Sequence, residues 1–291
     1  MKKRIVILGA GFGGAYTAMY LEKYLKKVKE PVELIIINKE NYFVFQPMLA
    51  EVVGGTLGVY DTINPIRKLL KKANLYVRDI ESIDIENKEI VLTPKFSHKA
   101  ESIPFDHLVM ALGTVTDFRG LPGIHEHALP FKNLADSIAI RNRVIDVIEA
   151  AANTKDEMTK RKLLTFVVGG GGFSGSEVVA EINDFVRKTT KDYPNIDQKM
   201  IRVIIAHSKS RLMNNEMPES LSNYAGKLLK KRGVEIYFNT HLKTATPDEA
   251  VFDTGERIPT KTVISTVPSS PNPLLEGLPL EYSRGRIVTD A

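Results

Sequence analysis

The N-terminal part of the chain alternates between wholly apolar runs and one mixed stretch. Residues 5–8 read Ile-Val-Ile-Leu, which is typical of a strand buried on both faces of a parallel sheet. Apolar residues then recur at helical spacing between lysines until Pro31, and residues 32–37 form a second apolar run. The pattern predicts a β-α-β unit over residues 5–37. Its helix is expected to bury Ala15, Ala18, Met19, Leu21, Leu25 and Val28.

The same order of elements returns in the second half of the chain. We expect a strand at residues 163–168, a helix at 176–188 and another strand at 201–206. Such a repeat indicates two nucleotide-binding units rather than one large sheet.

The remaining segments predict smaller elements around these units. Alternation of polar and apolar residues at 76–92 predicts an antiparallel meander, and residues 106–112 predict one more buried strand. Further along we expect a strand, a hairpin, a last strand and a rigid connector at residues 233–238, 252–259, 262–267 and 268–273.

The amino-acid composition excludes several classes of chemistry and partner. The 291 residues are 43% hydrophobic, enough for two packed domains. There is no cysteine, which excludes disulfides and redox-active thiol pairs, so any redox work belongs to a bound cofactor. The net charge is +5 and the pI is about 9.1, but the lysines are scattered and predict no nucleic-acid partner. No apolar run approaches the ~20 residues that span a bilayer.

A glycine motif joins the first predicted strand to its helix. Gly9, Gly11 and Gly14 fit the pattern G-x-G-x-x-G, with Phe12 and Gly13 between them. The first glycine allows a tight turn, the second lets a pyrophosphate approach the backbone, and the third lets the helix pack closely on the strand. The helix N-terminus then favours the anion. The motif predicts a dinucleotide site; the alternative is a merely structural turn.

The second unit repeats this motif. Its glycines are Gly170, Gly172 and Gly175, with Phe173 and Ser174 between them. Ser176 and Glu177 follow, not Lys-Ser or Lys-Thr, so a P-loop for triphosphates is excluded. Both units are therefore expected to be Rossmann-like, three-layer α/β domains.

Neither unit has the acidic residue that usually ends the second strand and binds a ribose. Asn38 stands there in the first unit and His207 in the second. An asparagine can still bond a hydroxyl. His207, with Lys209 and Arg211 close behind, cannot repel a ribose 2′-phosphate as a carboxylate would. The choice between NADH and NADPH stays open, and we lean towards NADH.

Several segments resemble type II NADH:quinone dehydrogenases. Residues 41–49 read N-Y-F-V-F-Q-P-M-L and resemble the family's N-Y-x-x-F-Q-P-x-L segment. Residues 106–113 resemble the strand and glycine that close the family's FAD site, and residues 131–136 resemble its crossing into the NADH domain. Residues 175–177 and 232–234 resemble its G-V-E and R-G-V segments.

The resemblance implies a fold, cofactors and an activity. It implies an FAD-binding domain at residues 1–125 plus 272–291 and an inserted NAD(P)H-binding domain at 126–271. Hydride would pass from NADH or NADPH to FAD, and two electrons would then pass to a quinone. The whole protein would be cytoplasmic and peripheral on the inner face of the cell membrane, as part of a respiratory chain, and a homodimer is an allowed assembly.

The resemblance also implies site residues. Glu177 would be an acid near nicotinamide and flavin; the alternative is an acid in the first turn of a helix, stabilised by the macrodipole. Phe43, Phe45, Gln46 and Pro47 would line the flavin, although aromatic loop residues also serve as packing. Ala111 and Gly113 would close the FAD site.

The chain departs from the family pattern at its C-terminal end. Residues 285–291 resemble the strand that returns to the FAD domain, and we expect the following Gly-Asp strand, the quinone site and the membrane-binding helices to lie in a missing C-terminal part. Two other functions stay open: a soluble reductase that passes electrons to a ferredoxin, and a truncated, non-catalytic dinucleotide-binding fragment.

Two further patterns predict no additional site. His125 and His127 form an H-x-H pair without an apparent third ligand, so we predict no metal site, and His98, His107 and His241 stand alone. Basic residues at 227–232 indicate a solvated helix face or cations at a helix C-terminus.

Overall fold

The computed structural model describes residues 2–95, 99–118, 120–266, 269–283 and 285–290. The chain divides into two compact units: residues 1–45, 63–115 and 269–291 form unit 1, and residues 46–62 and 116–268 form unit 2. Residues 46–62 and 116–125 group with unit 2, whereas we expected them in the first domain. The cofactor of each domain stays a prediction.

Unit 1 is built on a four-stranded parallel sheet in the order β5-β2-β1-β9. Its strands are β1 (Lys3–Leu8), β2 (Val32–Asn38), β5 (Asn74–Val77) and β9 (His107–Met110). Ile7 of β1 pairs with Ile36 on one side and with Val109 on the other. With α1 (Phe12–Tyr24) between β1 and β2, the predicted β-α-β unit is confirmed.

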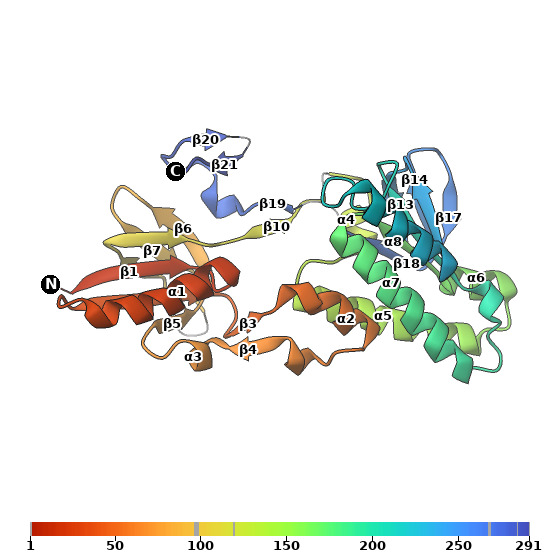
Figure 1. The fold of residues 1–291 in the computed structure, drawn as a ribbon, viewed down its shortest axis with the longest axis horizontal. Coiled ribbons are helices and arrows are strands. Elements are labelled where there is room, and N and C mark those ends of the chain that lie inside the picture. Colours follow the sequence, from red (N-terminus) through yellow and green to blue (C-terminus); the bar gives the residue numbers. More distant parts are fainter. Residues whose placement is uncertain (1, 96–98, 119, 267–268, 284, 291) are drawn as a thin grey trace. The chain divides into compact units, whose positions relative to one another are not determined.

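The two faces of this sheet are covered by different layers. Val6 and Leu8 point to one face and pack against the antiparallel strands β6 (Ile80–Asp84), β7 (Glu89–Leu92) and β8 (Glu101–Pro104). Ile7 points to the other face and packs against α1 and α3 (Ile66–Leu69); Figure 1 shows α1 running alongside β1. The meander is confirmed, but Tyr76 belongs to the parallel strand β5, and strand β8 was not predicted.

Helix α1 buries a narrower face than its sequence predicted. Gly14, Ala15 and Ala18 are buried, whereas Met19 and Val28 are 43% and 46% exposed, so the prediction for these two residues was wrong. Small residues bring this helix close to the sheet, so the larger side chain of Met19 is left outside, whereas Val28 lies beyond the end of α1 at Tyr24.

Smaller elements complete unit 1 and its connections. They are η1 (Leu25–Lys27), β3 (Tyr42–Val44), β4 (Ile63–Pro65), β10 (Thr114–Thr116), β19 (Ser269–Pro271), η6 (Pro273–Leu275), β20 (Tyr282–Ser283) and β21 (Arg286–Ile287). The expected connector at 268–273 contains strand β19, which pairs with β10; residues 267 and 268 lie outside the described residues.

Unit 2 contains a five-stranded sheet in the order β11-β18-β12-β13-β14, in which neighbouring strands are parallel. The strands are β11 (Ala128–Pro130), β12 (Thr165–Gly169), β13 (Arg202–His207), β14 (Val234–Phe238) and β18 (Thr262–Ser265). The second repeat is confirmed, but Leu163 ends helix α6 (Glu157–Leu163) and does not start β12.

Alternate side chains of β12 and β13 enter two different hydrophobic cores of unit 2. Phe166 and Ile205 face α5 (Leu134–Asn153) and α7 (Phe173–Thr189). Val167 and Ile204 face the antiparallel strands β15 (Leu242–Ala245), β16 (Glu249–Phe252) and β17 (Arg257–Pro259). Each unit is thus a three-layer α/β structure, with helices on one face of a parallel sheet and a small antiparallel sheet on the other.

Further helices cover unit 2. Helix α2 (Leu49–Gly54) packs against α5 and α7, and it lies beside α5 in Figure 1. The others are η2 (Gln46–Met48), η3 (Val59–Asp61), α4 (Ile124–His127), η4 (Thr190–Asp192), η5 (Gln198–Met200) and α8 (Glu219–Lys231). In the parts of the chain that the structure describes, no helix is long and apolar enough to cross a bilayer.

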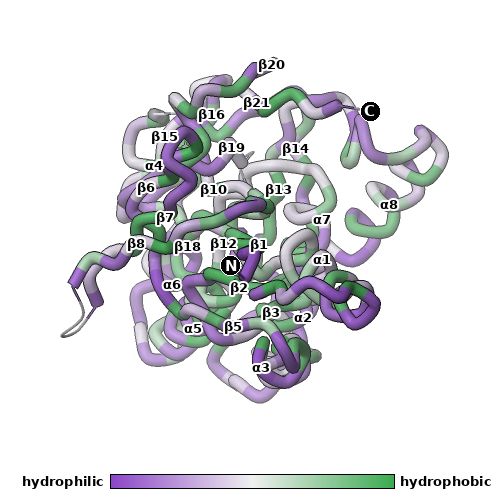
Figure 2. The backbone as a smooth tube through the Cα atoms, turned by 90° about the vertical axis from the view of Figure 1, so that its left-hand side faces the viewer, coloured by the Kyte–Doolittle hydropathy of each residue, from purple (hydrophilic) through white to green (hydrophobic). Residues whose placement is uncertain are grey.

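Helix α8 carries the basic cluster at residues 227–232. Its coil in Figure 2 changes between hydrophilic and hydrophobic colours, and its buried residues are Ser222, Gly226 and Leu229. Lys230 and Lys231 lie in its last turn, where the negative end of the helix dipole favours cations. The predicted solvated, basic helix end is confirmed.

The glycine turns of the two units have the same geometry. Gly9 and Gly170 have φ angles of +92° and +112°, which favour glycine. A Cβ atom on Gly14 would lie 1.8 Å from the carbonyl oxygen of Gly9, and one on Gly175 would lie 1.9 Å from that of Gly170. The tight turn and the close approach of helix to strand are therefore confirmed for both motifs.

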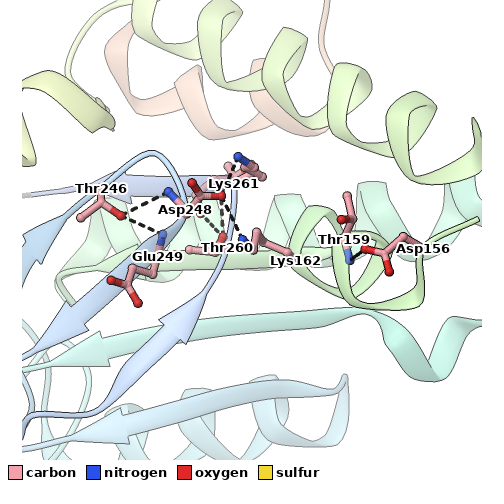
Figure 3. A network of polar contacts seen from close by, with 9 residues as sticks. Asp156, Thr159, Lys162, Thr246, Asp248, Glu249, Thr260 and Lys261 are labelled. Atoms are coloured by element: carbon pink, nitrogen blue, oxygen red, sulfur yellow. Dashed lines mark hydrogen bonds and ion pairs between the residues drawn. The ribbon is translucent and has the colours of Figure 1, made fainter. Parts of the chain in front are cut away.

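A polar network ties the antiparallel sheet of unit 2 to α6 (Figure 3). The Asp248 carboxylate accepts from the ammonium groups of Lys162 at 2.9 Å and Lys261 at 2.7 Å. These two cations lower the pKa of Asp248 to about 2. The carbonyl of Asp248 accepts from the amide of Thr260, and its own amide donates to the hydroxyl of Thr246.

We expect Asp248→Asn to lower the stability of the protein at neutral pH, because it removes a charge that two lysines stabilise. The folded carboxyl has a pKa of about 2 against 3.8 ordinarily, so its contribution is complete above 3.8 and is lost as pH falls towards 2. Urea unfolding of both proteins across this range measures it. Glu126→Gln is the control, because the Glu126 carboxylate forms no ion pair with the described residues. If the difference in unfolding free energy between the wild-type protein and Asp248→Asn grows on acidification, the assignment is contradicted.

We expect Gly175→Ala to lower the free energy of unfolding by about 2–3 kcal/mol, because the new Cβ would overlap the carbonyl oxygen of Gly170. Gly226→Ala is the matched control: its Cβ meets no atom within 4 Å, and alanine in a helix interior should add up to about 1 kcal/mol. Thermal denaturation of the two variants compares them. Equal melting temperatures would show that the Gly175 contact is not a constraint.

Candidate functional site

A cavity of about 610 Å³ lies at the carboxyl ends of β12, β13 and β18 in unit 2. Ligands of open parallel sheets bind at this edge. Its walls combine the glycine turn with three loops. The lining residues are Leu121, Ile124, Gly169–Gly172, Ala206–Lys209, Asn214–Glu216, Thr240–Leu242, Ser265 and Thr266.

The middle residue of the glycine turn is held from both sides. The amide of Gly171 donates to Nδ1 of His207 at 3.1 Å, and its carbonyl accepts from the amide of Met213 at 2.7 Å. A Cβ atom on Gly171 would lie 2.6 Å from the His207 ring. The Thr266 hydroxyl bonds the carbonyls of Gly169 and Gly170 at 2.9 and 3.2 Å. The turn is therefore held in place by hydrogen bonds from three other segments of unit 2.

His207 is neutral at this site. Burial lowers the pKa of His207, and its Nδ1 is already an acceptor, so the ring proton belongs on Nε2. Nε2 is buried and finds no hydrogen-bond partner among the described residues. A buried donor without a partner costs free energy of folding, and the hydrogen bond to Nδ1 holds the ring in this orientation.

The N-terminus of α7 faces the cavity through Gly172, its N-cap. No side chain caps α7, and its first turn holds no acidic residue. The first amides of a helix need acceptors, and the helix dipole favours a negative group there. The turn and the helix end together fit a phosphate group.

The charged groups at the cavity differ from those we expected. Arg211 donates to the carbonyls of Met217 at 2.9 Å and Asn214 at 2.8 Å, so its guanidinium holds the loop and does not line the cavity. Lys209 does line it, together with Glu216, which sequence reasoning missed because a loop brings it back to the turn. His241 also lines the cavity and pairs with Asp253 at 2.9 Å, so it does not stand alone.

The glycine turn of unit 1 uses a similar tether. Oδ1 of Asn38 accepts from the amide of Ala10 at 2.9 Å, and Nδ2 donates to the carbonyl of Glu40 at 2.9 Å. Asn38 therefore holds its turn as His207 holds the other, at the end of the second strand in each unit. A contact of Asn38 with a ribose stays a prediction.

The structure brings several predicted site residues of unit 1 together. Gly9 and Gly13 lie against Ala111, which follows β9, and no atom lies within 4 Å of a Cβ built on Gly11. The ring of Phe12 contacts that of Phe45 edge to face, with centroids 5.5 Å apart. Helix α1, like α7, has no side-chain cap and no acid in its first turn.

The other residues predicted to line the flavin lie in different environments, and so does Gly113. Phe43 is only 8% exposed and lies in the core with α1, so packing accounts for it. Gln46 and Pro47 are exposed in η2, which groups with unit 2. Gly113 has a φ angle of +68° and open space around it. Flavin contacts of these residues stay predictions.

Glu177 lies in α7 near a second carboxylate, that of Glu51 in α2. Partial burial raises the pKa of Glu177, and the charge of Glu51 raises it further. Oε2 of Glu51 is buried and has no hydrogen-bond partner among the described residues. Because the first turn of α7 contains no acidic residue, the explanation of Glu177 by the helix dipole was wrong. Sequence reasoning missed Glu51 because contact between α2 and α7 alone brings the carboxylates together.

The H-x-H pair lies in α4, not in a loop. His125 and His127 are exposed there, and His125 contacts the ring of Phe118 with centroids 5.0 Å apart. Within the described ranges, no three His, Asp or Glu side chains are grouped for a metal ion. His98 lies outside those ranges.

Known proteins are similar to this chain in sequence. The type II NADH:quinone oxidoreductase of Staphylococcus epidermidis is 31% identical over 258 residues, 87% of this chain and 59% of the relative. The external alternative NAD(P)H-ubiquinone oxidoreductase B4 of Arabidopsis thaliana mitochondria is 29% identical over 258 residues, 85% of this chain and 43% of the relative. The resemblance predicted from residues 41–49 is confirmed.

The fold has a counterpart among solved structures. NDH2 from Plasmodium falciparum in complex with NADH superposes with a TM-score of 0.85 at 23% identity, over 94% of this chain and 56% of that chain. The chain thus spans about half the length of the relatives it matches. Residues 3–291 match the family described as pyridine nucleotide-disulphide oxidoreductase, and the chain therefore belongs to that family.

Proposed function

We propose that this protein is an FAD-dependent NAD(P)H dehydrogenase with a quinone as its electron acceptor. The observation that carries the proposal is the second glycine turn, which is held rigid at the cavity of unit 2 and opens on an uncapped helix. NADH or NADPH would bind there with its pyrophosphate at Gly172 and the first turn of α7.

The residues of unit 1 fit a second dinucleotide. Its turn repeats the positive φ angle, the tether from the second strand and the uncapped helix. Open space at Gly11 admits a pyrophosphate, and FAD would lie there beside Phe12 and Phe45. When bound, FAD accepts a hydride from the reduced nicotinamide and passes on electrons singly or in pairs. The chain contributes binding and orientation, and it has no cysteine for thiol chemistry.

The relatives support the acceptor. Both curated relatives named above carry quinone or ubiquinone in their names. On that basis we assign quinone as substrate and a peripheral position on the inner face of the cell membrane. A homodimer belongs to the same proposal, and sedimentation of the purified protein tests it.

Glu177 is proposed as the acid that moves a proton during turnover. Burial and the charge of Glu51 raise the pKa of Glu177 towards neutral pH, where an acid can both donate and accept a proton. Glu51 is proposed as a positioning residue that tunes Glu177 through its charge.

The purified protein should be yellow with flavin absorption that NADH bleaches anaerobically, and a quinone analogue should restore the colour. Gly14→Ala should lose flavin yet keep NAD⁺ binding, whereas Gly175→Ala should keep flavin and lose NAD⁺, because each Cβ would overlap atoms of its own unit. Absorption spectra and calorimetric titration measure both. A colourless wild-type protein that ignores NADH would refute the dehydrogenase.

Glu51→Gln should move the pH midpoint of flavin reduction to lower pH. Removing the nearby negative charge lowers the pKa of Glu177, since a like charge disfavours ionisation. Stopped-flow measurement of the reduction rate against pH gives the midpoint. Glu177→Gln should abolish this titration and serves as the control. A midpoint that stays fixed in Glu51→Gln would exclude the coupling.

A further inference from the structure

The cavity of unit 2 carries its carboxylate on a loop and not at the end of the second strand. We propose that Glu216 makes this site selective for NADH over NADPH. The inference rests on the proposed function, because it assumes that the nucleotide of unit 2 is a pyridine dinucleotide. It names Glu216 as the residue that determines which of the two is bound.

The strand end itself cannot discriminate between the two nucleotides by charge. His207 occupies the position where an acid usually binds the adenosine ribose, and it is neutral and tethered to Gly171. Its Nε2 is buried away from the cavity, and a neutral imidazole neither attracts nor repels a 2′-phosphate strongly. Discrimination therefore depends on the charged groups of the surrounding loop.

Glu216 lies against the glycine turn. Its Oε1 is 3.4 Å from the position of a Cβ built on Gly172, and its Oε2 accepts from the amide of Asn215 at 3.1 Å. The negative charge also acts on His207, where it opposes the effect of burial on the pKa. The carboxylate is thus close to both the second glycine and the strand end, between which an adenosine ribose binds in this fold.

The loop that carries Glu216 is fixed by several hydrogen bonds. The amide of Met213 bonds the carbonyl of Gly171 at 2.7 Å, and the amide of Glu216 bonds the carbonyl of Met213 at 3.2 Å. Arg211 clamps two carbonyls of the loop, and Ser222 bonds the carbonyl of Leu212. The backbone at Glu216 is therefore anchored on the turn, although the side chain itself is exposed.

The negative charge of Glu216 favours an adenosine ribose that carries no 2′-phosphate. A carboxylate accepts hydrogen bonds from the 2′- and 3′-hydroxyl groups, whereas it repels a 2′-phosphate. Few cations can offset this repulsion, because Arg211 directs two of its N–H groups to loop carbonyls and, among the described lysines and arginines, Lys209 alone lines the cavity. An exposed lysine is screened by salt and holds a phosphate as a point charge without a fixed geometry.

The test is calorimetric titration of the oxidised protein with NAD⁺ and with NADP⁺. These two ligands differ only in the 2′-phosphate, and neither transfers a hydride to an oxidised flavin. We expect the wild-type protein to bind NAD⁺ about tenfold more tightly, and Glu216→Gln to reduce this ratio about tenfold by improving NADP⁺ binding. Glu216→Arg, with a cation in the same place, should reverse the preference.

Glu219→Gln is the matched control, because this acid is exposed in the first turn of α8 and does not line the cavity. Its ratio should equal that of the wild-type protein. If neither nucleotide binds, the proposed function fails and the selectivity fails with it. If both bind but Glu216→Gln strengthens them equally or leaves the ratio unchanged, the assignment of Glu216 alone is overturned.

Discussion

Both units depend on the close approach of a helix to the carbonyl oxygen of the glycine turn that precedes it. This approach leaves no room for a side chain. Gly14 approaches the carbonyl of Gly9, and Gly175 approaches that of Gly170, so closely that a Cβ atom would overlap the oxygen. This approach points the first amides of each helix at the end of its strand. It is the reason that two stretches of sequence far apart in the chain produce the same uncapped, anion-favouring surface.

The parallel sheets supply the rigid support for these turns. Alternate residues of β1 and β12 enter cores on opposite faces, so each strand is fixed by a helical layer and by a small antiparallel sheet. A strand held on both faces cannot tilt without loss of packing. The second strand of each unit then fixes the turn itself, through Asn38 in unit 1 and His207 in unit 2.

The chemistry arises where loops and helices add charges to this support. Glu216 returns to the glycine turn through a hydrogen-bonded loop, and Glu51 reaches Glu177 through the packing of α2 on α7. In both cases a carboxylate acts on a group far from it in sequence. In the proposed function such pairs would adjust binding and proton transfer without altering the shared fold, as when one fold serves several substrates.

The sequence by itself determined the two β-α-β units, the tight turn and close packing at their glycines and the family, because strand periodicity and glycine spacing are local signals. It also excluded thiol chemistry, since cysteine is absent. It misjudged the exposed Met19 of α1, because burial depends on how closely a helix approaches its sheet. Only the tertiary structure placed Glu216 at the turn and tied Arg211 to its loop, since these contacts join residues through a folded loop that no periodicity encodes.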